Sequence, residues 1–335
     1  LENLGRDPDA DSCPTHVIRL ERRTEIIELN FTQACQILAA GLPGAVLRSH
    51  RLLPGGRANT NYLLETDDGA CVLRMYVRDA TTREKETALA NMLAELPVPR
   101  VLGVGDVDAF PPFALFEFRR GRPLAEWLTE SALPESAARN IGRLLAQTSK
   151  YSFERFGDLR VVDDGLCAVA WEVGENALLG FMRWCLFESP AGERLGPRAR
   201  DRLWEITQRE AEHDDGLPPT LSHGDFNPTN ILLDETGTVT ALLDWEFAHA
   251  GGPLSDIGNL LRVRDEYELP ATFADELHAG ISEGGLALPQ DWRARAAFTD
   301  LTSACEFLSS VEEKPQTHAA AKRQVHAYLD KHAGE

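Results

Sequence analysis

The feature that most constrains this chain is a short polar segment that runs directly into an apolar strand. Residues 221–234 read LSHGDFNPTNILLD, so His223, Asp225 and Asn230 stand within eight positions. A further carboxylate, Asp244, follows fourteen positions after Asn230, in the sequence LLDWEF. The pattern predicts a loop and a β-hairpin that bring two carboxylates and an amide to one place.

These residue types suit phosphoryl transfer from a nucleotide. That reaction needs a carboxylate beside the attacking hydroxyl and hard oxygen ligands for the magnesium ion that bridges the phosphates. Asp225 is the candidate base, and Asn230 and Asp244 are the candidate Mg²⁺ ligands. Their order and spacing parallel the catalytic-loop Asp, the Asn and the later metal-binding Asp of kinases. An ordinary turn is the weaker interpretation, because these residues at these offsets are expected in about one such sequence in a thousand.

Two neighbouring side chains are candidates to support the loop. His223 can serve as a base, but a histidine in this position more often holds a loop through hydrogen bonds to backbone carbonyls. We therefore predict a structural role for His223. In GGPLSDIGNLLR, Ser255 or Asp256 is predicted to cap a helix, and Asp256 is also the candidate to brace the loop.

The composition indicates a soluble globular protein that is long enough for two lobes around a cleft. The chain has 335 residues, of which 43% are hydrophobic and 26% are charged. No apolar run approaches the roughly 18 residues that a membrane helix needs, and no export signal is visible at the N-terminus. The six cysteines are scattered without a C-x-x-C pair, so neither zinc nor a disulfide framework is indicated. We expect a cytoplasmic protein without a membrane partner.

The net negative charge of the chain indicates which kind of partner it binds. The 53 acidic residues exceed the 34 basic ones by 19. This argues against nucleic acid, because phosphate backbones are bound through clustered Lys and Arg. A cationic small molecule is favoured instead. Since charges beyond a Debye length of about 8 Å are screened, net charge affects encounter more than the choice of ligand.

Apolar spacing predicts a small strand-rich lobe followed by a larger helical one. Helices are predicted at residues 32–41, 84–96, 137–148, 198–213 and 291–332. Strands are predicted at residues 45–53, 61–66, 71–77 and 113–118, and a hairpin of residues 231–233 and 239–243 is the expected exception in the helical half. The predicted organisation is a partly disordered tail (1–30), a nucleotide-binding N-lobe (31–118) and a helical C-lobe (119–335).

The segment LSHGDFNPTNILLDETGTVTALLDWEFAHAGGPLSDIGNLLR resembles the signature region of the aminoglycoside phosphotransferase and choline kinase family. The similarity extends from about residue 42 to at least residue 262. The resemblance implies an α+β, protein-kinase-like fold, with a small antiparallel sheet in the N-lobe and a larger, mainly helical C-lobe. It also implies ATP-dependent phosphorylation of a small-molecule hydroxyl, with GTP as the alternative donor, Asp225 as the base, and Asn230 and Asp244 as Mg²⁺ ligands.

The resemblance extends to a glycine-rich segment in the N-lobe. PGGRANTNY joins two predicted strands and resembles the G-G-x-x-N-x-x-Y loop of the family, which implies that Gly55, Gly56 and Asn59 contact the phosphates. A simple hairpin turn is the alternative. Arg74, in CVLRMY, occupies the place of the phosphate-binding Lys of kinases. An Arg keeps the charge and offers a bidentate fork, so the exchange does not predict loss of activity.

The remaining nucleotide contacts follow from the same resemblance. The acidic partner of Arg74 is expected on helix 84–96, with Glu86 as the better match and Glu84 as the alternative. Strand alternation places Val72 on the same face as Arg74, where it would cover the adenine. Hinge hydrogen bonds are expected from the backbone of Glu117, Phe118 and Arg119.

Several points stay open at this stage. Glu246, two residues after Asp244, can contact metal or substrate or can make a salt bridge. An aminoglycoside-type or other cationic acceptor is favoured, and a sugar or an amino alcohol is the alternative. The rival function is a non-catalytic nucleotide-binding module, which would have lost the base or a metal ligand, whereas Asp225, Asn230 and Asp244 are all present. Either a monomer or a dimer is expected.

Overall fold

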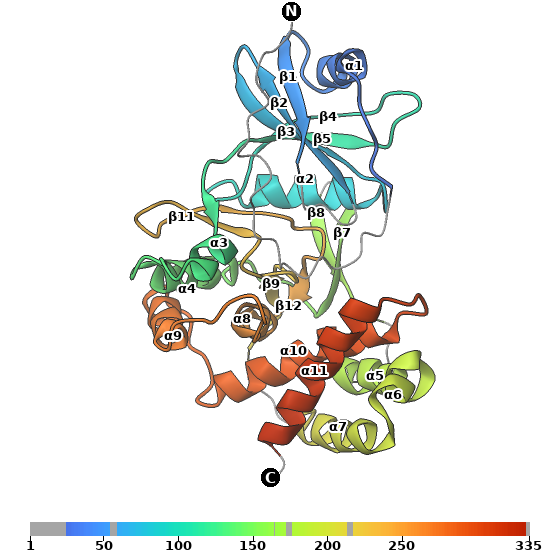
Figure 1. Ribbon diagram of the computed structural model, residues 1–335, viewed down its shortest axis with the longest axis vertical. Helices are drawn as coiled ribbons and strands as arrows, with labels where there is room; N and C mark the ends of the chain where they lie inside the picture. Colours follow the sequence, from blue (N-terminus) through green and yellow to red (C-terminus); the bar gives the residue numbers. More distant parts are fainter. Residues whose placement is uncertain (1–24, 54–58, 164, 172–175, 213–216, 333–335) are drawn as a thin grey trace, which may run out of the picture.

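The structure is a computed structural model that describes residues 25–53, 59–163, 165–171, 176–212 and 217–332. A strand-rich lobe lies above a larger, mainly helical lobe (Figure 1). This arrangement confirms the predicted two-lobed α+β fold. No helix in the described ranges is long and apolar enough to span a lipid bilayer.

The N-lobe contains a five-stranded antiparallel sheet in the order β1-β2-β3-β5-β4. Its strands are β1 (Leu47–Leu52), β2 (Thr60–Thr66), β3 (Gly69–Met75), β4 (Val101–Gly105) and β5 (Phe113–Glu117). The pairing of β2 with β3 places Asn61 opposite Arg74 and Leu63 opposite Val72. Since side chains alternate along a strand, Val72 and Arg74 share one face of the sheet.

Helix α1 (Phe31–Gly41) packs against this sheet because its apolar residues recur three and four apart. Ile37 and Leu38 are fully buried in the core that α1 forms with the strands. The helix begins with a capping box between Asn30 and Gln33. Its end lies so close to β4 that a Cβ on Gly103 would stand 1.9 Å from the carbonyl oxygen of Gly41, which explains the glycine.

The chain before α1 is attached to the same sheet. The N–H of Leu29 donates to the hydroxyl of Tyr62 at 3.0 Å, and this hydroxyl donates to the carbonyl of Ile27 at 2.9 Å. Leu29 is buried. The last residues of the segment that the sequence assigned to the tail therefore pack on the N-lobe.

Helix α2 (Thr82–Met92) lies between the sheet and the C-lobe (Figure 1). Its buried residues include Glu86 and Leu89. Burial of a glutamate on this face is unusual, because Glu is almost never buried without a partner. The helix thus carries a buried carboxylate to the boundary between the lobes.

The C-lobe consists mainly of helices. They are α3 (Leu124–Thr129), α4 (Ala137–Thr148), α5 (Ala177–Arg183), the π-helix η1 (Trp184–Glu188), α6 (Pro190–Leu195), α7 (Pro197–Glu210), α8 (Pro253–Leu261), α9 (Phe273–Glu283), α10 (Trp292–Ser309) and α11 (Pro315–Lys331). The predicted helical region 291–332 is divided between α10 and α11, because Pro315 cannot continue a helix and instead starts a new one. Helix α8 packs on α10.

Short strands of the C-lobe connect the helices to the lobe boundary. One sheet has the order β11-β10-β6, with β6 (Arg122–Pro123), β10 (Ile231–Leu233) and β11 (Val239–Leu242). The other has the order β8-β7-β12-β9, with β7 (Gly157–Val162), β8 (Gly165–Val169), β9 (Thr220–Ser222) and β12 (His249–Gly251). The expectation that the hairpin of 231–243 is the exception in this half was therefore wrong. The sequence VVDDGL before β8 has the same Asp-Asp-Gly turn signal as TDDGA in the N-lobe.

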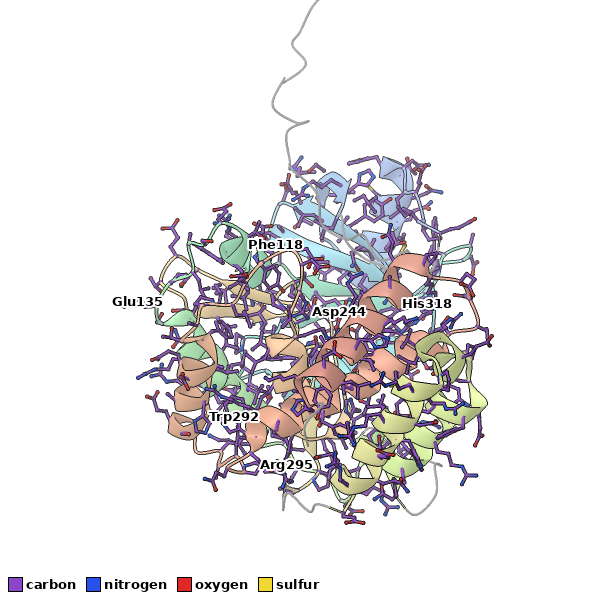
Figure 2. All side chains as sticks on the ribbon, turned by 60° about the horizontal axis from the view of Figure 1, so that its bottom comes forward. Phe118, Glu135, Asp244, Trp292, Arg295 and His318 are labelled. Atoms are coloured by element: carbon purple, nitrogen blue, oxygen red, sulfur yellow. The ribbon has the colours of Figure 1, made fainter. Side chains whose placement is uncertain are left out.

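This topology brings the sequence motif to the boundary between the lobes. The loop of residues 223–230 joins β9 to β10, and Asp244 follows the end of β11. Figure 2 labels Asp244 near the centre of the molecule and Phe118 beside the N-lobe. The loop and the hairpin thus belong to the part of the C-lobe that faces the N-lobe.

Candidate active site

The loop between β9 and β10 holds Asp225 by amide groups. Asn227 Nδ2 donates to Asp225 Oδ1 at 2.7 Å, and Asn230 Nδ2 donates to Asp225 Oδ2 at 3.0 Å. Asn230 Nδ2 also lies 2.9 Å from the carbonyl oxygen of Asp225. These contacts fix the orientation of the carboxylate and leave Oδ1 of Asn230 as the side-chain oxygen that can bind a metal.

Leu243 connects this loop to Asp244. The N–H of Leu243 donates to the carbonyl of Asn230 at 2.8 Å, and the carbonyl of Leu243 lies 2.9 Å from His223 Nε2. Because Leu243 directly precedes Asp244, both ends of the loop determine where that carboxylate stands. The structure thus brings Asp225, Asn230 and Asp244 together through the backbone N–H and carbonyl of one residue, Leu243.

His223 is a buried residue with bonds on both sides of its ring. The N–H of Asp225 donates to Nδ1 at 3.2 Å, so Nε2 carries the proton and donates to Leu243. The indole of Trp245 packs against the ring, with centroids 4.5 Å apart. Burial lowers the pKa of His223, against the opposing effect of Asp225. This geometry is that of a neutral histidine that supports the loop.

Acidification should therefore destabilise the protein through His223. Because its folded-state pKa lies below the ordinary 6.5, the unfolded chain takes up a proton there before the folded chain does. Stability should fall as the pH drops below about 6.5, by at most about 1.4 kcal/mol per unit from this group. Urea unfolding at about pH 7.5 and about pH 5.5 should show a larger loss for the wild type than for His223→Gln, which does not titrate. Equal losses would exclude this role.

Asp256, on α8, braces the loop from the other side. Its Oδ2 accepts the N–H of His223 at 2.7 Å and its Oδ1 accepts the N–H of Gly224 at 3.0 Å. Burial raises the pKa of Asp256 to about 7, although the two N–H donors act in the opposite direction. Helix α8 begins at Pro253 with Gly252 as its N-cap, so the prediction that Ser255 or Asp256 caps this helix was wrong.

Gly224 is required by the loop. Its φ of +77° favours glycine, and a Cβ there would stand 2.3 Å from the carbonyl oxygen of Phe247. The close approach keeps the loop against residues that follow Asp244. Asp244 itself has a φ of +67°, a left-handed conformation that Asp and Asn tolerate better than most residues.

Arg74 extends from β3 into a cluster of carboxylates. Its Nη2 lies 2.7 Å from Asp244 Oδ1 and 3.7 Å from Glu246 Oε2. Its Nε lies 3.0 Å from Glu86 Oε2, although the N–H is not aligned for a hydrogen bond. The hydroxyl of Tyr76 donates to the same oxygen of Glu86 at 2.6 Å. The side chain of Arg74 is only 10% exposed, so these charges interact in a largely water-free setting.

The cluster contains more acidic than basic groups. Glu86, Asp244 and Glu246 face the guanidinium groups of Arg74 and Arg78. Burial raises the pKa of Glu86 to about 7, against the effect of Arg74, and burial together with Asp244 raises that of Glu246. For Asp244, burial is outweighed by the charge and hydrogen bond of Arg74, which hold its pKa below the ordinary value. Asp244 is therefore ionised near neutral pH.

The choice between Glu86 and Glu84 is settled by burial and distance. Glu86 is 5% exposed and faces Arg74, whereas Glu84 is exposed on the other side of α2. At about pH 8, where Glu86 is ionised, Glu86→Gln should raise the nucleotide KM about tenfold, and Glu84→Gln should change it less than twofold, or about 0.4 kcal/mol. The difference between wild type and Glu86→Gln should shrink at about pH 6, because the wild-type carboxyl is then protonated. Equal effects of the two substitutions would refute the pairing.

The other predicted nucleotide contacts are only partly described. Gly55 and Gly56 lie outside the described residues. Val72 is half-buried on the face that carries Arg74. The N–H of Glu117 donates to the carbonyl of Arg100 at 2.8 Å, so hinge hydrogen bonds would have to use other backbone groups of 117–119. Asn59 is buried, and its Nδ2 donates to Glu246 at 3.1 Å.

The donor set around Asp244 suits magnesium. Mg²⁺ is usually held by one or two carboxylates together with waters and substrate phosphates, not by a cage of protein ligands. Within the described residues, no group of three or more His, Cys, Asp or Glu is arranged as such a cage. Asp244 and Asn230 Oδ1 supply two hard oxygens beside an excess of buried negative charge. The residues present therefore fit a Mg²⁺ ion that arrives with a nucleotide.

Sequence reasoning missed four residues of this site. Asn227 holds Asp225, Tyr76 holds Glu86, and Arg78 and Lys85 contact residues 246–248. For Asn227, the Asn-Pro dipeptide in DFNPTN is a turn signal. Tyr76 meets Glu86 within the N-lobe, whereas Arg78 and Lys85 act across the lobe boundary, and the spacing of these three residues carries no signal of the contacts.

The chain belongs to the phosphotransferase enzyme family. The sequence model of this family matches residues 49–298, about three quarters of the chain. This membership confirms both the resemblance inferred from the signature region and the predicted class of enzyme. One curated relative is the uncharacterized protein YcbJ of Bacillus subtilis (strain 168), which is 43% identical over 56 residues. That stretch is 16% of this chain and 18% of the relative.

Solved structures share the fold along most of the chain. Aminoglycoside phosphotransferase APH(4)-Ia is 16% identical, with a TM-score of 0.65 over 86% of this chain and 95% of that one. The GDP and kanamycin complex of APH(2")-IIIa is 17% identical, with a TM-score of 0.64 over 90% and 98%. Macrolide 2'-phosphotransferase MphH from Brachybacterium faecium is 19% identical, with a TM-score of 0.57 over 86% and 96%. These likenesses confirm the kinase-like fold.

Proposed function

We propose that this protein transfers the γ-phosphoryl group of ATP, or of GTP, to a hydroxyl group of a small molecule. The observation that carries the proposal is the convergence of Asp225, Asn230 and Asp244 through the backbone of Leu243, opposite Arg74 and Glu86. Family membership supports the same reaction class. A non-catalytic module is disfavoured, because the base and both metal-binding residues are present and ordered toward one another.

In this proposal Asp225 orients the acceptor hydroxyl and takes its proton as the hydroxyl oxygen attacks the γ-phosphorus. The bond from phosphorus to the bridging oxygen breaks, and the nucleoside diphosphate leaves. The two amides that hold Asp225 keep its carboxylate in one orientation. Such positioning of reacting groups is a main contribution of the protein to phosphoryl transfer. A Mg²⁺ ion held by Asn230 and Asp244 would neutralise charge on the phosphates.

Arg74 would hold the non-transferred phosphates. It is positioned by Glu86 and bonded to Asp244. A guanidinium offers several donors in a planar fork, so it can bind phosphate oxygens while it keeps one carboxylate partner. Gly55, Gly56 and Asn59 are proposed to cover the phosphates, Val72 the adenine, and the backbone of 117–119 to bind its edge.

We propose a cationic acceptor of the aminoglycoside type. The acidic balance of the chain supports it, and proteins of the same fold have been determined with hygromycin B and with kanamycin. A sugar or an amino alcohol is the second candidate. The proposal is for a soluble protein that acts without nucleic acid or membrane.

The test is a thermal-shift assay with ATP and GTP, each with and without Mg²⁺, followed by a transfer assay. Labelled nucleotide should deliver phosphate to at least one member of a panel of aminoglycosides, other antibiotics, sugars and amino alcohols. The expected result is a Mg²⁺-dependent stabilisation and a phosphorylated alcohol. If the wild type shows no nucleotide binding and no slow nucleotide hydrolysis, that result would contradict the proposed function.

A further inference from the structure

Three consecutive C-lobe residues, 246–248, receive side chains from several parts of the N-lobe. These residues directly follow Asp244 and Trp245, so contacts that fix their position also fix the position of the candidate metal-binding carboxylate. The N-lobe side chains that reach them are Asn59, Arg74, Arg78 and Lys85. This set of contacts has no counterpart in the roles assigned above.

The side chain of Glu246 is the centre of these contacts. Its Oε2 lies 3.1 Å from Asn59 Nδ2, 3.3 Å from Arg78 Nη2 and 3.7 Å from Arg74 Nη2. It is only 7% exposed, so the contacts are made away from bulk water. This oxygen is therefore used in contacts within the protein, and its removal would take one acceptor away from the buried amide of Asn59 and from the guanidinium of Arg78.

The backbone of the same segment is held as well. Lys85 Nζ, on α2, donates to the carbonyl of Glu246 at 2.6 Å and lies 3.3 Å from the carbonyl of Ala248. The guanidinium of Arg78 lies over the ring of Phe247, 5.1 Å from its centroid. Because Lys85 precedes Glu86, the helix that positions Arg74 is attached to this segment by the adjacent residue. Residues 246–248 are thus held by α2 and by the residues that follow β3.

We propose that Glu246 is a positioning residue that fixes Asn59, at the end of the glycine-rich segment, relative to Asp244. The inference rests on the proposed function, since it assumes that Asn59 and Asp244 serve one nucleotide. Glu246 acts through Asn59 and Arg74 and does not touch the reacting atoms. It holds Asn59 and the metal-binding carboxylate in one arrangement, because it contacts both Asn59 and Arg74, and Arg74 is bonded to Asp244.

If Glu246 has this role, its substitution should weaken nucleotide binding and leave acceptor binding unchanged. Glu246→Met fills a similar volume but offers no oxygen to the amide of Asn59. Nucleotide affinity should therefore fall about tenfold, the loss expected when one buried hydrogen bond to a charged group is removed. The acceptor KM should not change. Glu246→Gln restores an oxygen for Asn59 but not the charge for the arginines, so it should recover part of the affinity.

The experiment is a double-mutant cycle on the dissociation constant of ATP, measured by calorimetric titration with and without Mg²⁺. Asn59→Ala and Glu246→Met should each weaken binding about tenfold, and the double variant should lose far less than a hundredfold, because both substitutions remove the contact between Asn59 and Glu246. Glu84→Ala, on the exposed side of α2, is the matched control. Melting temperatures establish that each variant is folded, and the cycle with Glu246→Gln serves if Glu246→Met is not.

Two results would overturn the inference. Additive losses, about a hundredfold in the double variant, would mean that Glu246 does not act through Asn59. A loss confined to titrations with Mg²⁺, equal for Met and Gln at position 246, would make Glu246 a metal ligand. Absence of both ATP and GTP binding in the wild type, titrated in the same way, would instead overturn the proposed function itself, and this inference with it.

Discussion

Replacement of Asp225 by Asn should lower kcat by about three orders of magnitude, within the range that a general base contributes, and leave the dissociation constant of the nucleotide within about twofold. The amide keeps the shape of the side chain but cannot take a proton from the acceptor hydroxyl. The two amides that hold Asp225 come from Asn227 and Asn230. In Asp225→Asn, the new NH₂ group would lie against the NH₂ group of Asn227 or of Asn230. A small loss of stability should therefore accompany the loss of turnover.

Steady-state transfer and direct nucleotide titration together measure this effect. Glu235→Gln is the matched control, because Glu235 is exposed in the turn between β10 and β11 of the same hairpin. Its kcat should equal that of the wild type. Turnover of Asp225→Asn within about tenfold of the wild type would remove Asp225 from the role of base, since a base supplies at least about a hundredfold.

Replacement of Asp244 should abolish the contribution of Mg²⁺ to nucleotide binding. Asp244 is ionised because Arg74 holds its pKa down, and it is the sole carboxylate of the proposed ligand pair. The choice of substitution matters, because φ at this position is +67°. Ala in the left-handed region costs about 1–2 kcal/mol in its own right, whereas Asn tolerates it. Asp244→Asn is therefore the informative variant, and Asp244→Ala should show an added loss of stability.

Nucleotide titrations with Mg²⁺ and with a chelator test this expectation. The wild type should bind ATP more tightly with Mg²⁺, and Asp244→Asn should bind with similar, weak affinity in both conditions. Its kcat should fall about a thousandfold, as expected when charge stabilisation worth about 4 kcal/mol is lost from the transition state. An unchanged Mg²⁺ dependence would contradict the assignment of Asp244 as a ligand.

The parts of the site that the sequence predicts are those encoded locally. Asp225 and Asn230 lie five positions apart on one loop, and a short hairpin returns the chain to Asp244, so their proximity follows from the motif and the strands. The alternation of β3 likewise places Val72 beside Arg74 on one face. Local periodicity and turn chemistry also explain α1, α2 and the N-lobe hairpin.

The parts that it does not predict depend on contacts between distant segments. Asp256 braces the loop from a helix more than thirty residues away, and Lys85 and Arg78 contact residues 246–248 from the other lobe. No spacing rule links such positions, because they meet only after the lobes have packed. The choice of Glu86 over Glu84 depends on the rotation of α2, which a count along the helix leaves open by two residues.

The hairpin of β7 and β8 is a different case. Its turn sequence carries an Asp-Gly signal, but the surrounding helical pattern gave that signal little weight. The hairpin pairs with β12 and thereby borders the segment that follows Asp244. Local turn chemistry was the better guide here than the average character of the region.

The proposed mechanism is tested most directly by a crystal structure with Mg²⁺ and a non-hydrolysable ATP analogue. The mechanism predicts one cation bound by Asn230 Oδ1 and a carboxylate oxygen of Asp244, at the roughly 2.1 Å typical of Mg²⁺, with phosphate oxygens completing its shell. Asp225 should face the γ-phosphate from the side open to the acceptor, and Arg74 should reach the other phosphates. A cation bound elsewhere, or a nucleotide whose γ-phosphate lies away from Asp225, would contradict it.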